Sequence, residues 1–381
     1  MRLTPKLLAL LISALGSHAI AADQVIRIGS ASPVSGPSAH LGKDTENGAR
    51  MAVDELNAKG VTIGGKKARF VLMAEDDGGD PKQGTAVAQK LVDANVAGVV
   101  GHLNSGTTVP ASKIYHAAGI VQITPSATTP MYTRQGFKTA FRLVANDNKV
   151  GSTLGRYAVG TLNAKRIAVI DDRTAFGQGL ADEFVKGIRA SGGKAQIVSR
   201  QFTSDKATDF NAILTQVKGN KPDLIFYGGM DAVAGPMLQQ MKALGLDIRF
   251  MAGDGVCSEK LPRLAGAGLG ENRVTCAIAG GVTGAVQEKT YDDFLVRYKK
   301  TFGYELDTYA GYAYDAVMVM AAAMQQAQSS DPAKFLPVMA NIRHTGVTGN
   351  ISFDAYGDLN NPAMTIYTFR GGKKVKLEVV R

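Results

Sequence analysis

Short apolar runs alternate along the chain with segments in which apolar residues recur every three or four positions. The short runs are typical of buried β-strands, and the wider spacing is typical of amphipathic helices. In the first half, strands are expected at residues 25–28, 69–74, 97–100 and 120–124. Helices are expected between them, at 49–56 before Gly60, at 88–92 after the capping pair Asp80-Pro81, and through 114–118. The alternation predicts βαβ units on a parallel sheet.

The same alternation begins again near residue 166. Strands are expected at 166–170, 195–198, 223–227 and 249–251, with helices at 180–188 before Gly192-Gly193, at 210–217 and at 237–244. This predicts a second doubly wound unit. Three further helices are expected around 291–298, 317–324 and 335–342, before a hairpin-like pair at 364–369 and 375–380 around Gly371-Gly372.

The first residues predict a cleaved secretory signal. Arg2 and Lys6 precede an uncharged stretch at 7–15 and the small-x-small run Ala19-Ile20-Ala21. The apolar run is shorter than the about 20 residues that span a bilayer. A buried first helix is the alternative. We expect residues 1–21 to be removed, leaving an exported soluble chain without a lipid anchor.

The two cysteines, Cys257 and Cys276, are the only pair available in an oxidising compartment. They are expected to form a disulfide across the Gly-rich stretch between them. Two unpaired buried thiols remain the alternative. A metal site is disfavoured, because the cysteines lack metal-ligand spacing and have no histidine nearby.

The formal net charge is +10, which can indicate a nucleic-acid or membrane partner. Loss of residues 1–21 removes two of the 43 basic residues and none of the 33 acids, which leaves +8. The remaining basic residues are scattered along the chain, and the cluster at Lys373, Lys374 and Lys376 has no interleaved aromatics. Nucleic-acid binding is therefore excluded.

Small and polar residues follow two expected strands in each half, at 101–105, 123–128, 228–231 and 252–255. Open α/β sheets bind ligands beyond the carboxyl ends of their strands, and helix N-termini favour anions there. Any one segment could be an ordinary loop. Four in matched positions favour a ligand cleft between two units.

Catalytic motifs are missing from the sequence. It contains no Gly-x-Ser-x-Gly, His-Glu-x-x-His, Cys-x-x-Cys or Gly-Lys-Ser/Thr. The glycines at 266, 268 and 270 are interpreted as a loop, and the acids at 75–80 as a helix cap rather than a Ca²⁺ site. His102 and His116 are interpreted as structural. The chain is expected to be no enzyme and to carry no cofactor or metal.

Several segments in order resemble the periplasmic binding proteins for leucine, isoleucine and valine. They are Ser35-Gly36-Pro37, Asp76-Asp77, Asp80-Pro81-Lys82-Gln83, Gly101-His102-Leu103, residues 123–128, Phe176-Gly177-Gln178-Gly179 and Tyr227-Gly228-Gly229. The resemblance covers essentially the whole mature chain. It implies an α/β fold with two doubly wound lobes joined by three hinge crossovers. The N-terminal lobe would comprise 22–145 plus 276–352, and the C-terminal lobe 146–275 plus 353–381.

The resemblance also implies a ligand site in the cleft. Ser105 and Thr128 would hold an α-carboxylate, and Asp254 would accept from an α-ammonium. Donors at one end and a carboxylate at the other suit a zwitterion, at roughly 1.5–3 kcal/mol per charge-assisted hydrogen bond. The neighbours expected at this site are Leu103, Asn104, Ser126 and Ala127, with a side-chain pocket of Leu41, Phe176, Met230 and Tyr309.

Two departures from the family pattern bear on that pocket. Leu41 and Met230 stand where tyrosines are expected, so flexible aliphatic walls could admit a larger or differently shaped group. The first-lobe cysteine pair of the family is replaced by Gly79 and Asn104.

The function implied is that of a monomeric periplasmic receptor. It would bind a branched-chain or other apolar amino acid and deliver it to an inner-membrane ABC permease. A receptor of the same fold for amides, urea-like solutes or aromatic carboxylates is the alternative, although such ligands would leave the charge of Asp254 unpaired. An exported hydrolase or the sensor domain of a signalling protein is a more distant one.

Overall fold

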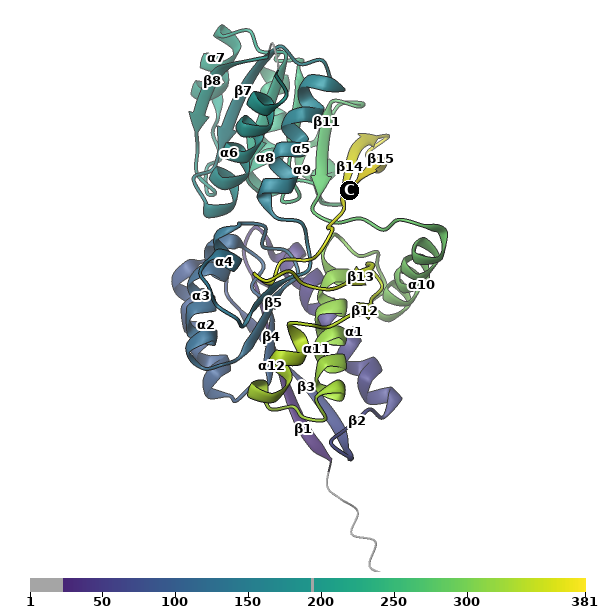
Figure 1. Cartoon of the computed structure of the whole chain (residues 1–381). Helices are drawn as coiled ribbons and strands as arrows, with labels where there is room; N and C mark the ends of the chain where they lie inside the picture. Colours follow the sequence, from purple (N-terminus) through teal and green to yellow (C-terminus); the bar gives the residue numbers. More distant parts are fainter. Residues whose placement is uncertain (1–22, 193–194) are drawn as a thin grey trace, which may run out of the picture.

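Two β-sheets organise the chain into two lobes stacked end to end (Figure 1). The computed structural model describes residues 23–192 and 195–381. The expected signal segment at 1–21 and the expected helix stop at Gly193 lie outside the described residues.

The first lobe is built on a six-stranded sheet in the order β2-β3-β1-β4-β5-β6. Its strands are β1 (Gln24–Ser32), β2 (Thr62–Ile63), β3 (Lys66–Asp76), β4 (Gly98–Gly101), β5 (Val121–Thr124) and β6 (Ala140–Arg142). Only the β2–β3 pair is antiparallel. Helices α1 (Ala39–Lys59) and α11 (Ala310–Gln326) cover one face, and α2 (Pro81–Asp93) and α3 (Ser105–Ala117) cover the other. The lobe is completed by the long helix α10 (Ala285–Phe302) and by the short elements α4 (Met131–Arg134), α12 (Pro332–Met339), β12 (His344–Thr345) and β13 (Asn350–Ile351).

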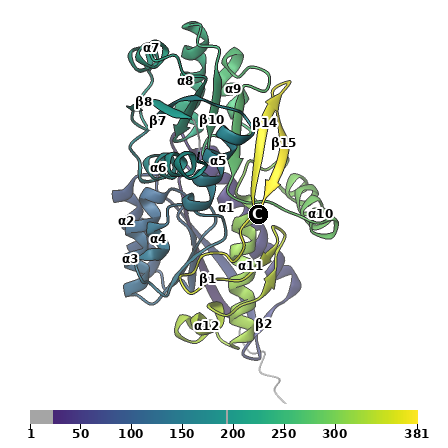
Figure 2. The same cartoon turned by 45° about the horizontal axis from the view of Figure 1, so that its top comes forward.

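The second lobe is built on a seven-stranded sheet in the order β15-β14-β11-β10-β9-β7-β8. Its strands are β7 (Arg166–Asp171), β8 (Gln196–Phe202), β9 (Leu224–Gly228), β10 (Arg249–Ala252), β11 (Val274–Ile278), β14 (Met364–Arg370) and β15 (Lys373–Val380). Helices α5 (Asp147–Gly160) and α6 (Ala175–Ala190) lie side by side on one face, as Figure 2 shows. The other face carries α7 (Asn211–Gly219), α8 (Asp231–Ala243), α9 (Leu261–Ala265) and the short 3₁₀ helix η1 (Gly266–Gly268). The antiparallel β14–β15 pair confirms the predicted hairpin.

The chain crosses between the lobes three times, between β6 and α5, between β11 and α10, and between β13 and β14. Hydrogen bonds join these crossovers to one another. The amide of Ala145 donates to Ala279 O at 2.7 Å, and the Asn146 side chain donates to Asp358 at 3.1 Å. The expected fold of two doubly wound lobes with three crossovers is confirmed. Because β11 ends at Ile278, the boundary expected at 276 falls inside this strand, and we place the second crossover after it.

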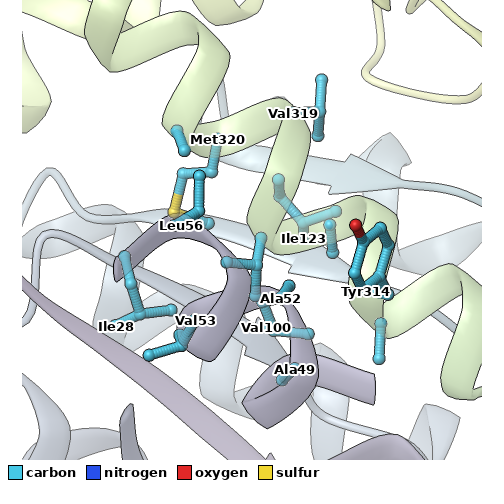
Figure 3. Packing of buried hydrophobic residues seen from close by; sticks show 14 of the residues in the cluster. Ile28, Ala49, Ala52, Val53, Leu56, Val100, Ile123, Tyr314, Val319 and Met320 are labelled. Carbon is cyan, nitrogen blue, oxygen red and sulfur yellow. The ribbon is translucent and has the colours of Figure 1, made fainter. Parts of the chain in front are cut away.

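The largest core lies where α1 and α11 meet above the first sheet (Figure 3). The helical spacing seen in the sequence is the reason, since Ala49, Ala52, Val53 and Leu56 all face inward and are at most 4% exposed. Met320 of α11 approaches β4 so closely that a Cβ at Gly98 would lie 2.3 Å from its sulfur. A side chain at position 98 would therefore force the Met320 side chain out of its place against β4.

Cys257 and Cys276 form a disulfide, with their Cα atoms 5.4 Å apart. Both residues are fully buried. The bridge ties the loop after β10 to strand β11, which confirms the favoured of the two cysteine interpretations.

We expect the double variant Cys257→Ser, Cys276→Ser to lose roughly 3 kcal/mol of unfolding free energy, because the unfolded chain gains the freedom of an open loop. Urea unfolding with and without a reductant measures this. The reductant should lower the midpoint of the native chain to that of the double variant and leave the variant unchanged. A native midpoint indifferent to reductant would contradict the bridge.

Candidate functional site

A small pocket lies between the lobes, beyond the carboxyl ends of the central strands of both sheets. Its volume is about 20 Å³, and it is called the inner pocket here. It is lined by Leu103, Asn104, Ser105, Ser126, Ala127, Phe176, Met230, Asp254, Gly255 and Tyr309. The structure thus brings together the site residues expected from the sequence, apart from Thr128 and Leu41.

The first lobe supplies hydrogen-bond donors to this pocket. Helix α3 begins at Ser105, and its N-cap residue Asn104 makes no side-chain capping bond, so the first amides of the helix face the cleft. The amides of Ser126 and Ala127 already donate to Thr124 Oγ1, at 3.3 and 2.9 Å. Ser105 and the helix start are therefore the main donors offered to an anionic group.

A buried arginine holds the loop behind these donors. Arg142 is 0% exposed and donates to the carbonyls of Ala127 and Thr129, at 2.9 and 2.8 Å. It also pairs with Asp358 from the third crossover at 2.8 Å. Burial acts to raise the pKa of Asp358, but the charge and hydrogen bonds of Arg142, with contributions from Thr133 and Arg134, together hold that pKa below its usual value. The Arg142 guanidinium thus connects the loop at residues 127–129 to the third crossover.

The second lobe supplies an acceptor. Asp254, in the loop after β10, is 1% exposed, and its Oδ2 accepts a hydrogen bond from the Tyr309 hydroxyl at 2.9 Å. Its Oδ1 is buried and has no hydrogen-bond partner among the described residues. Burial raises the pKa of Asp254 to about 6, so the carboxyl is mostly ionised at neutral pH. A cationic group in the inner pocket would satisfy the free oxygen.

Tyr309 is placed by a carboxylate from another helix. Asp44 of α1 accepts the amides of Thr308, Tyr309 and Ala310 at 2.9, 2.6 and 2.9 Å, where α11 begins. It also accepts the Tyr298 hydroxyl at 3.1 Å. A carboxylate at a helix N-terminus is stabilised by the free amides and the helix dipole.

The apolar wall is formed by Leu41, Leu103 and Tyr309, with Met230 packed against them. Leu41 is fully buried behind the pocket rather than in its lining. At Gly255 a Cβ would lie 2.6 Å from the Met230 sulfur, so only glycine lets this residue approach the wall so closely.

Thr128 differs from its expected role. The residue is 1% exposed, its hydroxyl has no hydrogen-bond partner in the described part of the chain, and it does not line the inner pocket. Its carbonyl instead accepts the amide of Asp147 at 2.8 Å, in the first crossover.

The lobes touch across the cleft in this structure. His40 of α1 contacts Asp231 of α8 through Nε2 and Oδ2 at 2.8 Å. The amide of Glu259 donates to Asp307 at 3.0 Å. Together with the Tyr309–Asp254 bond, these contacts describe a closed cleft.

Sequence reasoning missed Asp44, Arg142 and His40. His40 and Asp44 precede the predicted helical segment at 49–56, and nothing in their sequence context signals a role. Residues 23–192 and 195–381 contain no group of three or more His, Cys, Asp or Glu side chains able to hold a metal ion.

Comparisons with known proteins identify the family to which this chain is similar. Residues 25–374 match the family described as periplasmic binding protein. The Leu/Ile/Val-binding protein homolog 1 of Brucella abortus is 35% identical over 367 residues, which cover 94% of each chain. The leucine-, isoleucine-, valine-, threonine- and alanine-binding protein of Pseudomonas aeruginosa is 34% identical, with 96% of this chain and 95% of that protein covered.

A solved structure agrees with these sequence matches. It is the branched-chain amino acid transporter substrate-binding protein of Streptococcus pneumoniae, in complex with isoleucine. The TM-score is 0.83 at 29% identity, and the match covers 94% of this chain and 99% of that one.

We expect Asp254→Asn to stabilise the ligand-free protein at neutral pH. Between the unfolded-state pKa near 3.9 and the folded value of about 6, the folded chain keeps a proton that the unfolded chain has lost, so stability falls as pH rises through this window. At about 1.4 kcal/mol per pKa unit, the variant should gain up to roughly 3 kcal/mol at about pH 7.5 and about half of that near pH 5. Unfolding curves at both pH values test this.

Asp247→Asn is the matched control, because the Asp247 side chain is 97% exposed. It should change stability little at either pH. A gain for Asp254→Asn that is the same at both pH values would contradict a buried, ionised carboxyl.

Proposed function

The chain belongs to the periplasmic binding protein family, and we propose that it is a receptor for branched-chain or other apolar amino acids. The ligand would lie in the inner pocket with its carboxylate toward Ser105 and its ammonium toward Asp254. After closure the protein would deliver it to an inner-membrane ABC permease. The protein would act in the periplasm as a monomer, without catalysis.

The free oxygen of Asp254 is the observation that carries this proposal. A buried carboxylate oxygen without a donor is unfavourable by about 1–3 kcal/mol or more. An α-ammonium satisfies it, while the amides at the start of α3 satisfy the α-carboxylate. An amide, a urea-like solute or an aromatic carboxylate has no cation to offer, and this disfavours the alternative receptor.

The relatives support the ligand class. The Brucella and Pseudomonas proteins are named for leucine, isoleucine and valine, and the Streptococcus protein was solved with isoleucine. The apolar lining residues Leu103, Phe176 and Met230 suit an aliphatic side chain. In the described part of the chain, no helix has the length and apolar character needed to cross a membrane.

In a thermal-shift panel of the twenty amino acids, we expect leucine, isoleucine or valine to stabilise the protein. Binding to the folded state alone contributes about 2.7 kcal/mol when the ligand is at 100 times its Kd. Glycerol and benzoate at the same concentrations serve as controls without an ammonium. If no amino acid shifts the transition, the proposal is wrong.

We expect Asp254→Ala to weaken amino-acid binding on the order of 100-fold, because the α-ammonium loses its charged partner inside a closed pocket. Isothermal titration measures the affinity, and circular dichroism checks that the fold is intact. Tyr309→Phe removes only the hydroxyl that orients Asp254 and should cause a smaller loss. Unchanged affinity in Asp254→Ala would show that the ammonium is held elsewhere.

A further inference from the structure

The inner pocket opens into a much larger space toward the cleft entrance. This outer chamber has a volume of about 620 Å³ and shares Asn104, Ser105, Phe176 and Met230 with the inner pocket. Residues 78–81 bound it on the first lobe, and residues 172–175 and 204–206 bound it on the second.

The two volumes decide where a ligand side chain can go. A cavity needs about 10–15 Å³ to hold one water molecule, so the inner pocket of about 20 Å³ has no room for an apolar side chain. Phe176 and Met230 line both spaces, so the passage from the inner pocket into the outer chamber runs between them. A ligand held by Ser105 and Asp254 would therefore extend its side chain into this chamber.

The floor of the outer chamber carries a second buried carboxylate without a counter-ion. Asp172 is 2% exposed, and its Oδ1 accepts the amide and hydroxyl of Thr174 at 3.0 and 2.6 Å. Its Oδ2 is buried and has no hydrogen-bond partner among the described residues. Burial raises the pKa of Asp172 to about 6, so it is mostly ionised at neutral pH.

No cation of the described chain comes within ion-pair distance of Asp172. The neighbouring Arg173 guanidinium lies over the Phe202 ring, 3.7 Å from its centroid. Asp205 also borders the chamber and adds a second negative charge. Arg173 and Lys206 line the chamber as well, but neither forms an ion pair with these two carboxylates among the described residues. The side-chain oxygen of Asn104, at the mouth of the inner pocket, likewise lacks a donor. The chamber thus offers acceptors and negative charge that its own residues leave unpaired.

We infer that the cleft also takes α-amino acids whose unbranched apolar stem ends in a cationic N–H donor, the chemistry of lysine, ornithine and arginine. The methylene stem passes between Phe176 and Met230, and the terminal ammonium or guanidinium pairs with Asp172. This inference rests on the proposed function, because it uses the same anchors, Ser105 and Asp254, for the head group.

Three of the four positions that depart from the family pattern lie along this path, and only Leu41 lies behind it. Met230 replaces an expected tyrosine, and its flexible thioether chain can give way to a methylene stem. Gly79 and Asn104 replace the expected cysteine pair, and both line the outer chamber. Methionine makes the passage more adaptable than the expected tyrosine would. Glycine and asparagine make it more adaptable and more polar than a disulfide would.

The experiment compares ligands of equal stem length on the native protein by isothermal titration. Lysine should bind at least about tenfold more tightly than norleucine and Nε-acetyl-lysine, because neither of these brings a cation to Asp172. If lysine binds no more tightly than norleucine and Nε-acetyl-lysine, the inference is wrong, although the protein still binds amino acids. If no amino acid binds at all, the proposed function itself fails.

Variants then assign the effect to one carboxylate. Asp172→Asn should weaken lysine about tenfold or more and change leucine less than twofold, whereas Asp254→Ala should weaken both. Asp247→Asn, outside the cleft, should change neither. Equal losses of lysine and leucine in Asp172→Asn would overturn the inference. If Asp172→Asn fails to fold, the comparison of lysine with its uncharged analogues on the native protein decides the matter.

Discussion

The carboxylate of Asp44 joins three parts of the molecule on which the cleft depends. From α1 it accepts the amides that begin α11, and the same contact sets the position of Tyr309. Tyr309 in turn donates to Asp254 of the other lobe. A single buried charge in a core helix thus fixes where the first lobe meets the acceptor of the second. Loss of Asp44 would leave several helix amides unpaired inside the protein, which is unfavourable far beyond one surface contact.

Buried carboxyl groups around the cleft lower the free energy of unfolding of the ligand-free protein. Among the described residues, Asp254 and Asp172 each keep one carboxylate oxygen without a donor, and Asp147 at the start of α5 keeps two. Burial raises the pKa of Asp147 to about 8, so this carboxyl is mostly protonated at neutral pH, while the other two are mostly charged. The two charged carboxylates are unfavourable in the free protein and become favourable when a cation pairs with them. Their concentration around the cleft is what a receptor for a charged head group requires.

Sequence patterns predict much of this architecture and less of the site. The face of α1 that carries Ala49 and Leu56 is readable because its spacing matches the helix period. Helix α5 is not predicted from the sequence, because Gly151 and Gly155 interrupt the helical spacing of its apolar residues. A Cβ at Gly155 would lie 2.4 Å from Phe184 O, so helix packing selects a residue that lowers helix propensity. Residues that act through space, such as Asp44, carry no local signal, because their partners lie more than 250 positions away.

The hydrogen-bonded crossovers have a consequence for how affinity is distributed. Hydrogen bonds among Ala145, Ala279, Asn146 and Asp358 tie the three hinge segments together. The intrinsic free energy of closing the empty lobes does not depend on which solute binds afterwards. Substitutions at the hinge should therefore multiply every dissociation constant by a common factor and leave the ranking of solutes unchanged. Selectivity and overall tightness can then evolve as separate traits in one protein.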